Sequence, residues 1–382
     1  MNISLKPESD GMLHLDALRF FAACAVVAWH WSASIQLATG SDPREFVRFL
    51  TLAVDLFFII SGIVMFNVYF RRMVDGASFL KFMKHRIARL YPLHLATFLI
   101  MLAFSAAAFR LHLPIRHPEM FDYRGILPNL FLLQSFPVPY GSTFNFPAWS
   151  ISAEMVCYTL LPVAFFFCRR LPWLPILLAL LGIVILTAHS GLTWTEWAAQ
   201  YSFLRALPAF LFGIALGRYS SLLKRIPVPH LLLPVSAVLF LASGFLGLSR
   251  IFSLLFVYAI VTSAYAADVQ KRPSRFIIAV APLGLLTYSI YMLHIVYQNI
   301  AIRFLQVFFH LSRPANNVAV VLSFLPLLVL AYLSYKYFEI PARRWISSFT
   351  GFRKTAPSQA SPSDIAVSPM QAAVEPSPAS LK

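Results

Sequence analysis

The chain has 382 residues and a formal net charge of +16, with 59% apolar and only 12% charged residues. Soluble domains carry about 25% charged residues, so this composition excludes an ordinary water-soluble protein. The positive charge would suggest nucleic-acid binding in a soluble chain, but here the basic residues lie in short clusters between apolar runs, where they indicate membrane topology.

A membrane-spanning helix needs roughly 20 apolar residues. In chain order, the segments that predict such helices are 17–36, 49–69, 91–110, 148–168, 173–189, 202–218, 229–247, 250–268, 280–308 and 318–338. We therefore expect an all-α fold, a polytopic integral membrane protein with about ten transmembrane helices in one bundle. The segment 125–136 is apolar but short and bounded by proline, which is typical of a re-entrant or interfacial piece.

Lysine and arginine predict the orientation of these spans. If the N-terminus is cytoplasmic, the loops on the cytoplasmic side carry most of the basic residues. We therefore expect a cytoplasmic N-terminus at 1–16, a membrane domain at 17–347 and a cytoplasmic tail at 348–382. The tail is rich in Pro, Ser and Ala and is predicted to be disordered. The first span is predicted to be a retained signal anchor.

The first span contains two ionisable residues, Arg19 and His30, which are costly inside a membrane and therefore candidates for function. Eleven residues separate them, so on an α-helix they share one face and lie about 16 Å apart along the axis. That face would offer an anion-binding cation at one level and a general base at another. The alternative is an arginine reaching the interface and a histidine hydrogen-bonded within the bundle.

A basic segment, FLKFMKHRIARLYP, precedes the third predicted span as a cytoplasmic hairpin. Lys81, His85 and Arg89 share one helix face, and Arg86 lies beside it. Since arginine binds phosphate through two parallel hydrogen bonds, this segment is a candidate site for a polyphosphate ligand. The alternative is a topology signal that also contacts anionic lipid headgroups.

The motif PAWSISAEMVCY opens the fourth predicted span with Trp149, Ser150, Ser152 and Glu154. Either these residues are an interfacial tryptophan, a helix cap and a carboxylate at the helix dipole, or they face a substrate cavity.

The motif LGLLTYSIYMLH brings Tyr288, Tyr291 and His294 near one face of a later span. These side chains either line the cavity or join helices by polar contacts. Asp55 and Arg205 are two further intramembrane charges, and each needs a partner or a water-filled cavity. The sequence shows no spacing typical of metal ligands.

Together these motifs resemble the acyltransferase 3 family of bacterial membrane O-acyltransferases that modify surface polysaccharides. The resemblance covers roughly residues 13–347. It rests on six elements in the family's order: LDALRFFAACAVVAWHW with its Arg-x10-His spacing, VDLFFIISGIVMF, FMKHRIARLYP, PAWSISAEMVCY, LGLLTYSIYMLH and FEIPARRW. The chain departs from the family at Ala53, where glycine is frequent, and at Ala153, which leaves Glu154 as the only acid of that motif.

The resemblance implies an enzyme of the bacterial inner membrane. It would transfer an acyl group, usually acetyl, from cytoplasmic acyl-CoA to a sugar hydroxyl of a surface or exported glycan, or of a lipid-linked saccharide. On this interpretation Arg19, Arg86, Arg89 and Lys81 bind acyl-CoA, and acetyl-CoA is a donor substrate, not a resident cofactor. His30 acts as general base or acyl carrier.

Catalytic roles are also expected for Arg19 and Glu154, and either Glu154 or Asp55 would orient His30 or bind acceptor hydroxyls. The remaining cavity residues are expected to be Asp55, Trp149, Ser150, Ser152, Arg205, Tyr288, Tyr291 and His294.

Two other classes of function also fit ten spans. A transporter or flippase of an anionic or glycan substrate would use intramembrane arginine and a cytoplasmic anion site, although the chain shows no internal repeat. A membrane scaffold without chemistry would leave the Arg19–His30 face without a use. The sequence leaves open the acceptor, the length of the acyl group and the oligomeric state.

Overall fold

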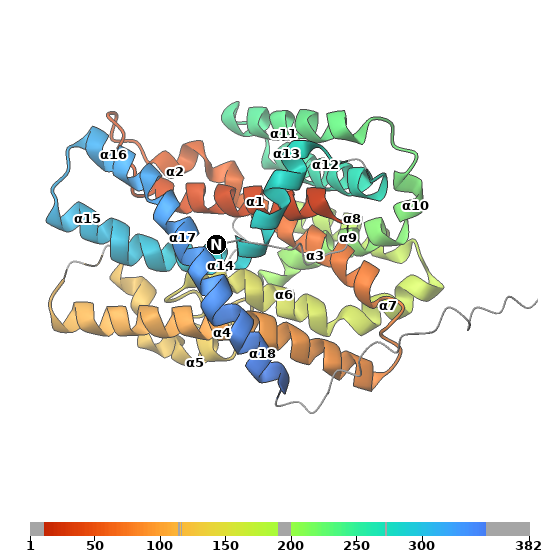
Figure 1. Cartoon of the computed structure of the whole chain (residues 1–382), viewed down its shortest axis with the longest axis horizontal. Coiled ribbons are helices and arrows are strands. Elements are labelled where there is room, and N and C mark those ends of the chain that lie inside the picture. The colour runs from red at the N-terminus through yellow and green to blue at the C-terminus, as the bar shows by residue number, and fades with distance from the viewer. Residues whose placement is uncertain (1–10, 114, 116, 190–199, 272, 349–382) are drawn as a thin grey trace, which may run out of the picture.

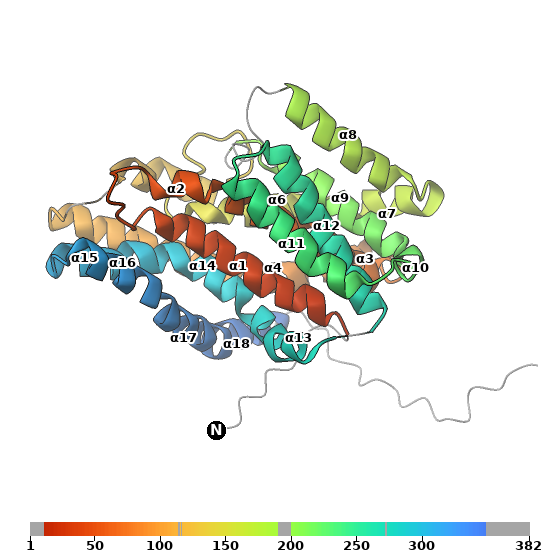
Figure 2. The ribbon, with the colours of Figure 1, turned by 90° about the horizontal axis from the view of Figure 1, so that it is seen from above.

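The protein is described by a computed structural model that covers residues 11–113, 115, 117–189, 200–271 and 273–348, so the predicted tail lies outside the described residues. Within these ranges the chain is all-helical, as predicted, and contains no strand. The helices run mostly along one direction and form a single bundle (Figures 1 and 2). The longer ones are α1 (Leu13–Ser32), α3 (Ala53–Tyr69), α4 (Gly76–Arg110), α6 (Trp149–Thr159), α7 (Leu161–Arg170), α8 (Leu174–His189), α9 (Phe203–Arg218), α11 (Pro229–Phe245), α12 (Arg250–Val269), α14 (Thr287–Tyr297), α16 (Arg313–Leu322) and α17 (Phe324–Ser334).

Short elements connect or extend these helices. The short α-helices are α2 (Pro43–Phe46), α5 (Ile126–Leu130), α10 (Ser220–Leu223), α13 (Arg275–Val280), α15 (Arg303–Phe308) and α18 (Ile340–Ser348). Two 3₁₀ segments precede spans, η1 (Arg48–Leu52) and η6 (Ala281–Leu286). Two π-helical segments, η7 (Gln298–Ile302) and η8 (Tyr335–Glu339), lie inside longer helical runs.

Six continuous helical segments in the described residues are long and apolar enough to cross a membrane. They are Leu13–Ser32, Arg48–Tyr69, Gly76–Arg110, Arg250–Val269, Arg275–Phe308 and Arg313–Ser348. A seventh is counted if α6 and α7, which meet at a bend of 47°, form one span. The chain is therefore a multi-pass membrane protein. The shorter helices α8, α9 and α11 coincide with three further predicted segments, but the expected count of about ten is not confirmed.

The basic segment before the third predicted span differs from its expected form. The basic segment expected as a hairpin before the third span is instead the first part of α4, which continues for 35 residues through Pro92 to Arg110. Asp75 caps this helix, since its side chain accepts a hydrogen bond from the backbone N–H of Ser78, and this bond holds the pKa of the Asp75 carboxyl below its ordinary value. The basic side chains are thus held on a rigid helix.

The centre of the bundle is the crossing of α3 and α9, which pack closely on each other. Gly62 and Gly213 lie where the two backbones approach most closely, because a Cβ atom built on either would lie 2.1 Å from a carbonyl oxygen of the opposite helix. Close approach through small residues is the usual way in which helices associate in membranes. It brings Asp55 on α3 next to Arg205 on α9.

Gly213→Ala is expected to force α3 and α9 apart and to destabilise the protein by about 1–3 kcal/mol. The added methyl group would collide with the carbonyl oxygen of Ile59, which belongs to the backbone and cannot move aside. Thermal unfolding of the detergent-solubilised protein measures the effect. Gly76→Ala is the matched control, since a Cβ atom at Gly76 meets nothing within 4 Å. Equal melting temperatures of the two variants would contradict this description of the crossing.

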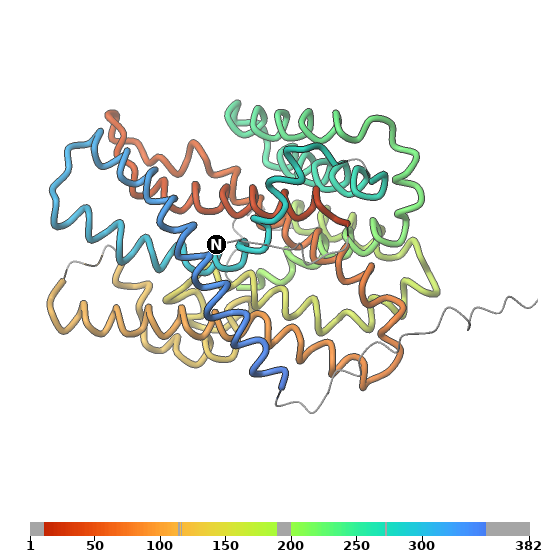
Figure 3. Tube along the Cα trace, viewed as in Figure 1, coloured from red at the N-terminus to blue at the C-terminus, as the bar shows by residue number. Residues whose placement is uncertain are grey.

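The last helices cover one side of the bundle. In Figure 1, α17 and α18 run diagonally across the helices behind them, and the tube in Figure 3 shows the same crossing. Helix α17 packs on α14, and α18 packs on the first part of α4. Helix α8, in contrast, lies at the edge in Figure 2 and packs on α9. Two cavities lie along α1 and α14, one lined also by α3, α4 and α6 and the other by η7, α15 and loop residues.

Candidate active site

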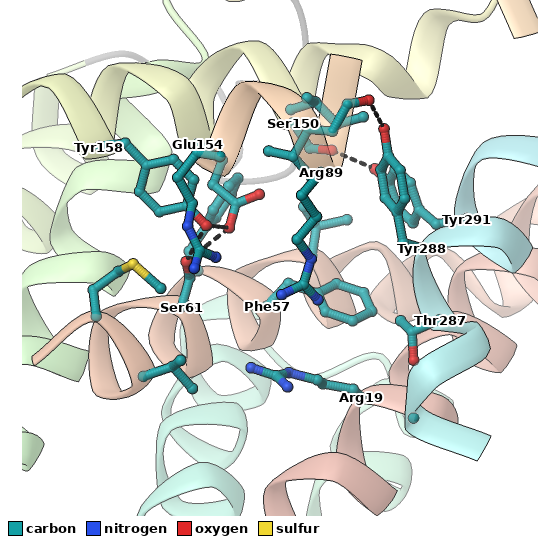
Figure 4. Close-up of a pocket in the computed structure, with 18 of the residues that line it drawn as sticks. Arg19, Phe57, Ser61, Arg89, Ser150, Glu154, Tyr158, Thr287, Tyr288 and Tyr291 are labelled. Carbon is teal, nitrogen blue, oxygen red and sulfur yellow. Dashed lines mark hydrogen bonds between the residues drawn. The ribbon is translucent and has the colours of Figure 1, made fainter. Parts of the chain in front are cut away.

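The first cavity, here called the arginine cavity, has a volume of about 130 Å³ and is enclosed by α1, α3, α4, α6, η6 and α14. Three arginines line it, Arg19 from α1 and both Arg86 and Arg89 from α4. Figure 4 shows Arg19 and Arg89 extending from opposite walls toward the same space. Its other polar lining residues are Ser61, Ser150, Glu154, Tyr158, Thr287, Tyr288 and Tyr291.

Arg86 is held in this wall by aromatic rings. Its guanidinium carbon lies 5.5 Å from the ring centroid of Tyr69, 5.6 Å from that of Phe82 and 5.7 Å from that of Tyr158, all within cation–π range. It also donates a hydrogen bond of 3.2 Å to the hydroxyl of Tyr69. Its Nε atom is buried without a partner among the described residues, as is the hydroxyl of Thr287. Since none of these contacts neutralises its charge, Arg86 is well suited to bind an anion.

Glu154 forms a compact polar cluster with Ser61 and Tyr158 in the wall of the cavity (Figure 4). Its Oε1 atom accepts hydrogen bonds from the hydroxyl of Ser61 at 2.7 Å and from that of Tyr158 at 2.5 Å. Neither bond uses the Oε2 atom of Glu154, which can accept a hydrogen bond from a further donor. The cluster joins α3 to α6, and it offers one negative group in a cavity otherwise dominated by arginine.

The second cavity, here called the histidine cavity, has a volume of about 250 Å³ and lies further along α1 and α14. Helix α1 contributes Arg19 to the arginine cavity but Trp29 and His30 to the histidine cavity, so the two cavities follow each other along this helix. The remaining lining residues are Ala33, Ser34, Arg44, His117, Met120, Phe121, Phe144, Phe146, Ile295, Gln298, Asn299, Arg303 and Gln306.

The hydrogen bonds of His30 and His294 fix the tautomers of both rings. A carbonyl oxygen only accepts, so the 2.9 Å contact between His30 Nδ1 and the carbonyl of Val26 requires a proton on Nδ1. By the same reasoning His294 carries its proton on Nδ1, which lies 2.6 Å from the carbonyl of Tyr291. The Nε2 atom of His294, 3.1 Å from His30 Nδ1, then shares this one N–H with the Val26 carbonyl in a three-centre hydrogen bond. A neutral His30 therefore has its lone pair on Nε2.

A wall of two rings separates the cavities. Tyr291 lines the arginine cavity, and its ring centroid lies 5.8 Å from that of His294. His294 lies in turn 4.8 Å from His30, which lines the histidine cavity. On the arginine side, Ser150 donates a 2.8 Å hydrogen bond to the hydroxyl of Tyr291, as Figure 4 shows. Of the two histidines, only His30 lines one of the two cavities, and His294 lies between it and Tyr291.

The structure brings together most of the residues that the motifs had indicated. Those that line the arginine cavity are Arg19, Arg86, Arg89, Ser150, Glu154, Tyr288 and Tyr291. His30 lines the other cavity, so the face shared by Arg19 and His30 serves two cavities. Arg19 also contacts Asp16, its Nη1 atom lying 3.0 Å from Oδ1.

Other predicted residues lie elsewhere. Asp55 was expected to orient His30 or to line the cavity with Arg205. Instead the two form an ion pair at 2.5 Å, at 0% and 1% side-chain exposure, and neither lines either cavity. Trp149 packs against the Arg205 guanidinium, 5.6 Å from its ring centroid. A buried charge is stable only beside a charge of opposite sign. Asp55 and Arg205 satisfy each other in this way, so neither needs a ligand or a water-filled cavity.

Three further expected residues lie outside the linings of these two cavities. Ser152 does not line a cavity but accepts a 3.1 Å hydrogen bond from the backbone N–H of Ser135, which ties the short segment after α5 to α6. Lys81 is exposed and belongs to neither lining. His294 is fully buried in the wall between the cavities, and it orients His30 in the place expected for Glu154.

The motifs missed the amides and the arginine of the histidine cavity, namely Gln298, Asn299, Gln306 and Arg303. They lie in the predicted span 280–308, so the rule that directed attention to His30 would have found them, because each is polar inside an apolar segment.

Comparison with known proteins gives a consistent result. A family model described as an acyltransferase domain matches residues 12–336. A protein named acyltransferase MdmB from Streptomyces mycarofaciens is 35% identical over 165 residues, which are 41% of this chain and 40% of that protein. Protein 2 in the picA locus of Rhizobium radiobacter is 32% identical over 159 residues, 37% of this chain and 76% of that protein. No solved structure matches.

Proposed function

The chain belongs to the acyltransferase 3 family, and from this premise we propose that it transfers an acetyl group from acetyl-CoA to a sugar hydroxyl of a surface or exported glycan. The observation that carries the proposal is the position of His30. It is an oriented neutral base at a wall between two cavities, one rich in arginine and one rich in amides. A transferase with an anionic donor and a hydroxyl-bearing acceptor needs a separate cavity for each substrate and a base where the two cavities meet.

The arginine cavity is the proposed donor site. Arg86 and Arg89 would bind the phosphates of CoA, because their guanidinium groups match phosphate oxygens, and Arg19 would complete the positive wall. Glu154 suits the pantetheine arm, since its unused Oε2 atom can accept an amide N–H. The thioester would then reach Tyr291, which lines the same cavity, and for direct transfer it has to pass the wall of Tyr291 and His294 to meet an acceptor beside His30.

The transfer step follows from the tautomer of His30. Its Nε2 lone pair takes the proton of an acceptor hydroxyl while the hydroxyl oxygen attacks the thioester carbonyl. The C–S bond breaks, the acetyl group passes to the sugar oxygen, and CoA leaves as a thiolate that takes up a proton. His294 accepts from Nδ1–H of His30 and so keeps the lone pair on Nε2 until Nε2 takes the proton, which the imidazolium then gives to the thiolate. Direct attack needs no acyl-histidine intermediate.

The proposed orientation has the N-terminus in the cytoplasm of a bacterial inner membrane. Its support is the excess of lysine and arginine in the loops on that side. With this orientation the arginine cavity, near the start of α1, lies toward the cytoplasmic supply of acetyl-CoA. The histidine cavity, near the end of α1, lies toward the outer side, where an exported glycan would be presented.

The purified protein in lipid nanodiscs tests this function directly. Radiolabelled acetyl-CoA is added together with total surface glycan from cells that lack the gene, and both free thiol and label in the glycan are measured. Acetyl transfer is expected, with one CoA thiol released for each acetyl group that the glycan gains. A protein that moves glycan across vesicle membranes without consuming acetyl-CoA would be a transporter or flippase and would overturn the proposal.

Arg86→Gln and Arg89→Gln are each expected to raise the KM for acetyl-CoA by about tenfold to a hundredfold with little change in kcat. Each variant removes a charge-assisted hydrogen bond to phosphate. These bonds stabilise bound acetyl-CoA equally in the ground state and in the transition state, so their loss raises KM and leaves kcat unchanged. Initial rates in the nanodisc assay give both constants. Arg110→Gln is the control, because Arg110 is exposed at the other end of the same helix. An unchanged KM in both variants would show that acetyl-CoA does not bind in the arginine cavity.

A further inference from the structure

The histidine cavity contains three amide side chains whose orientation is set by the protein. Gln298 donates from Nε2 to the carbonyl of His30 at 2.9 Å, and Gln306 donates from Nε2 to the carbonyl of Ser34 at 3.0 Å. Asn299 donates from Nδ2 to the carbonyl of Ile295 at 3.0 Å. Since a carbonyl cannot donate, each contact must be made by the amide nitrogen.

The oxygens of these amides are consequently left for a ligand. None of the three accepts a hydrogen bond from another described residue. Two of the amides, Gln298 and Asn299, stand on the π-helical segment η7, a form that occurs mostly as single turns at functional sites. Three oriented acceptors in the cavity that His30 also lines suit a ligand with several hydroxyl groups, such as a sugar.

Arg303 is a positively charged residue in the same cavity, and it favours a ligand with a negative charge. Its guanidinium has no carboxylate or carbonyl partner among the described residues, and its Nε atom is buried with no hydrogen bond. The indole nitrogen of Trp29, in the same cavity, is also buried without a partner. The other arginine there, Arg44, is paired with Asp42 at 2.6 Å. No Asp or Glu stands among the lining residues that the structure describes.

An unpaired cation held within a protein is costly, and an anion that enters the cavity removes the cost. A guanidinium binds carboxylate or phosphate through two parallel hydrogen bonds, and the indole N–H offers a third donor nearby. The cavity therefore combines acceptors for hydroxyl groups with donors for one acidic group.

We propose that the acceptor is an acidic sugar, whose hydroxyls bind the amide oxygens and whose anionic group binds Arg303. The anionic group is either the carboxylate of a uronic acid or the phosphate of a phosphorylated or lipid-linked saccharide, which present the same chemistry to a guanidinium. This inference rests on the proposed function, because it identifies the histidine cavity as the acceptor site of the transferase.

Equilibrium binding tests the inference without any acyl donor. Full-length protein in phosphatidylcholine nanodiscs is titrated calorimetrically with maltotriose, with maltotriuronic acid and with maltotriose 1-phosphate. The wild type is expected to bind at least one acidic sugar about tenfold or more tightly than maltotriose. Whichever acidic sugar binds better distinguishes carboxylate from phosphate. Arg303→Gln is expected to abolish the preference, and Arg303→Lys to retain part of it.

Arg313→Gln is the matched control, since Arg313 is an exposed arginine at the start of α16 outside both linings. Equal affinities for neutral and acidic sugars, no measurable binding of any of them, or a preference that survives Arg303→Gln would overturn the inference. Native mass spectrometry from phosphatidylglycerol nanodiscs supplies a further arm. If Arg303→Gln loses a bound phosphatidylglycerol but keeps its affinity for the sugars, the cavity holds a lipid headgroup and the inference is wrong.

The same measurements separate this inference from the proposed function. Binding that depends on Arg303 without acetyl transfer to any glycan would reject the transferase and leave the anion site standing. Acetyl transfer to glycan that is unaffected by Arg303→Gln would support the transferase and reject the anion site.

Discussion

His30→Gln is expected to lower kcat for acetyl transfer by about 10²–10⁴-fold while leaving the affinity for acetyl-CoA unchanged. The variant removes the Nε2 lone pair that takes the acceptor proton, and His30 does not line the arginine cavity where the donor binds. Single-turnover rates with radiolabelled acetyl-CoA measure the effect. His230→Gln is the control, since His230 is exposed at the start of α11.

The role of His294 makes this prediction sharper. Because His294 acts only through His30, the double variant His30→Gln/His294→Gln should be no slower than His30→Gln alone. His294→Gln by itself should retain part of the activity, because the carbonyl of Val26 still holds the Nδ1 proton of His30. A properly inserted His30→Gln protein with full activity would remove His30 from the chemistry, whatever His294 does.

Asp55→Leu or Arg205→Leu is expected to destabilise the protein by about 3–5 kcal/mol, which is a large share of the stability of a typical folded protein. Each variant removes one partner of the ion pair at the crossing of α3 and α9, where the remaining side chain has almost no exposure. Arg205 also donates to the carbonyl of Thr51 at 3.0 Å, so losing it frees a second buried acceptor.

The double variant Asp55→Leu/Arg205→Leu tests the physical reason. Without either charge there is no uncompensated ion, so the double variant should be more stable than either single variant. Size-exclusion profiles and thermal unfolding in detergent measure all four proteins. If the double variant were destabilised by the sum of the single effects, the pair would not be coupled and the ion pair would have no special role in joining α3 to α9.

The local patterns predicted much of the fold because the bilayer imposes a simple rule. A segment of apolar residues has to become a helix, so the ranges 49–69 and 250–268 agree closely with the helical segments Arg48–Tyr69 and Arg250–Val269. The rule says little about where a helix ends outside the apolar run. It therefore missed that α4 continues through the basic segment, and that α6 and α7 are separate helices with a 47° bend between them.

The candidate site was predicted in part for a related reason. Charged and polar residues inside apolar segments are conspicuous, and so Arg19, Arg86, Glu154 and Tyr291 were identified before their cavity was known. The same rule could not separate residues that face a cavity from residues that satisfy one another. Asp55 and Arg205 are as conspicuous as Arg19, yet they are paired and buried.

By itself the sequence determined that the chain is a helical membrane protein, and its motifs resembled one family of acyltransferases, because hydropathy and short motifs are local properties. Only the tertiary structure decided how the polar residues are shared between two cavities, since that depends on which helices meet. His30 and His294 lie 264 positions apart, and no spacing along one helix relates them. Their contact, and the unpartnered Arg303 beyond it, arise from the packing of α1 against α14 and its π-helical extension.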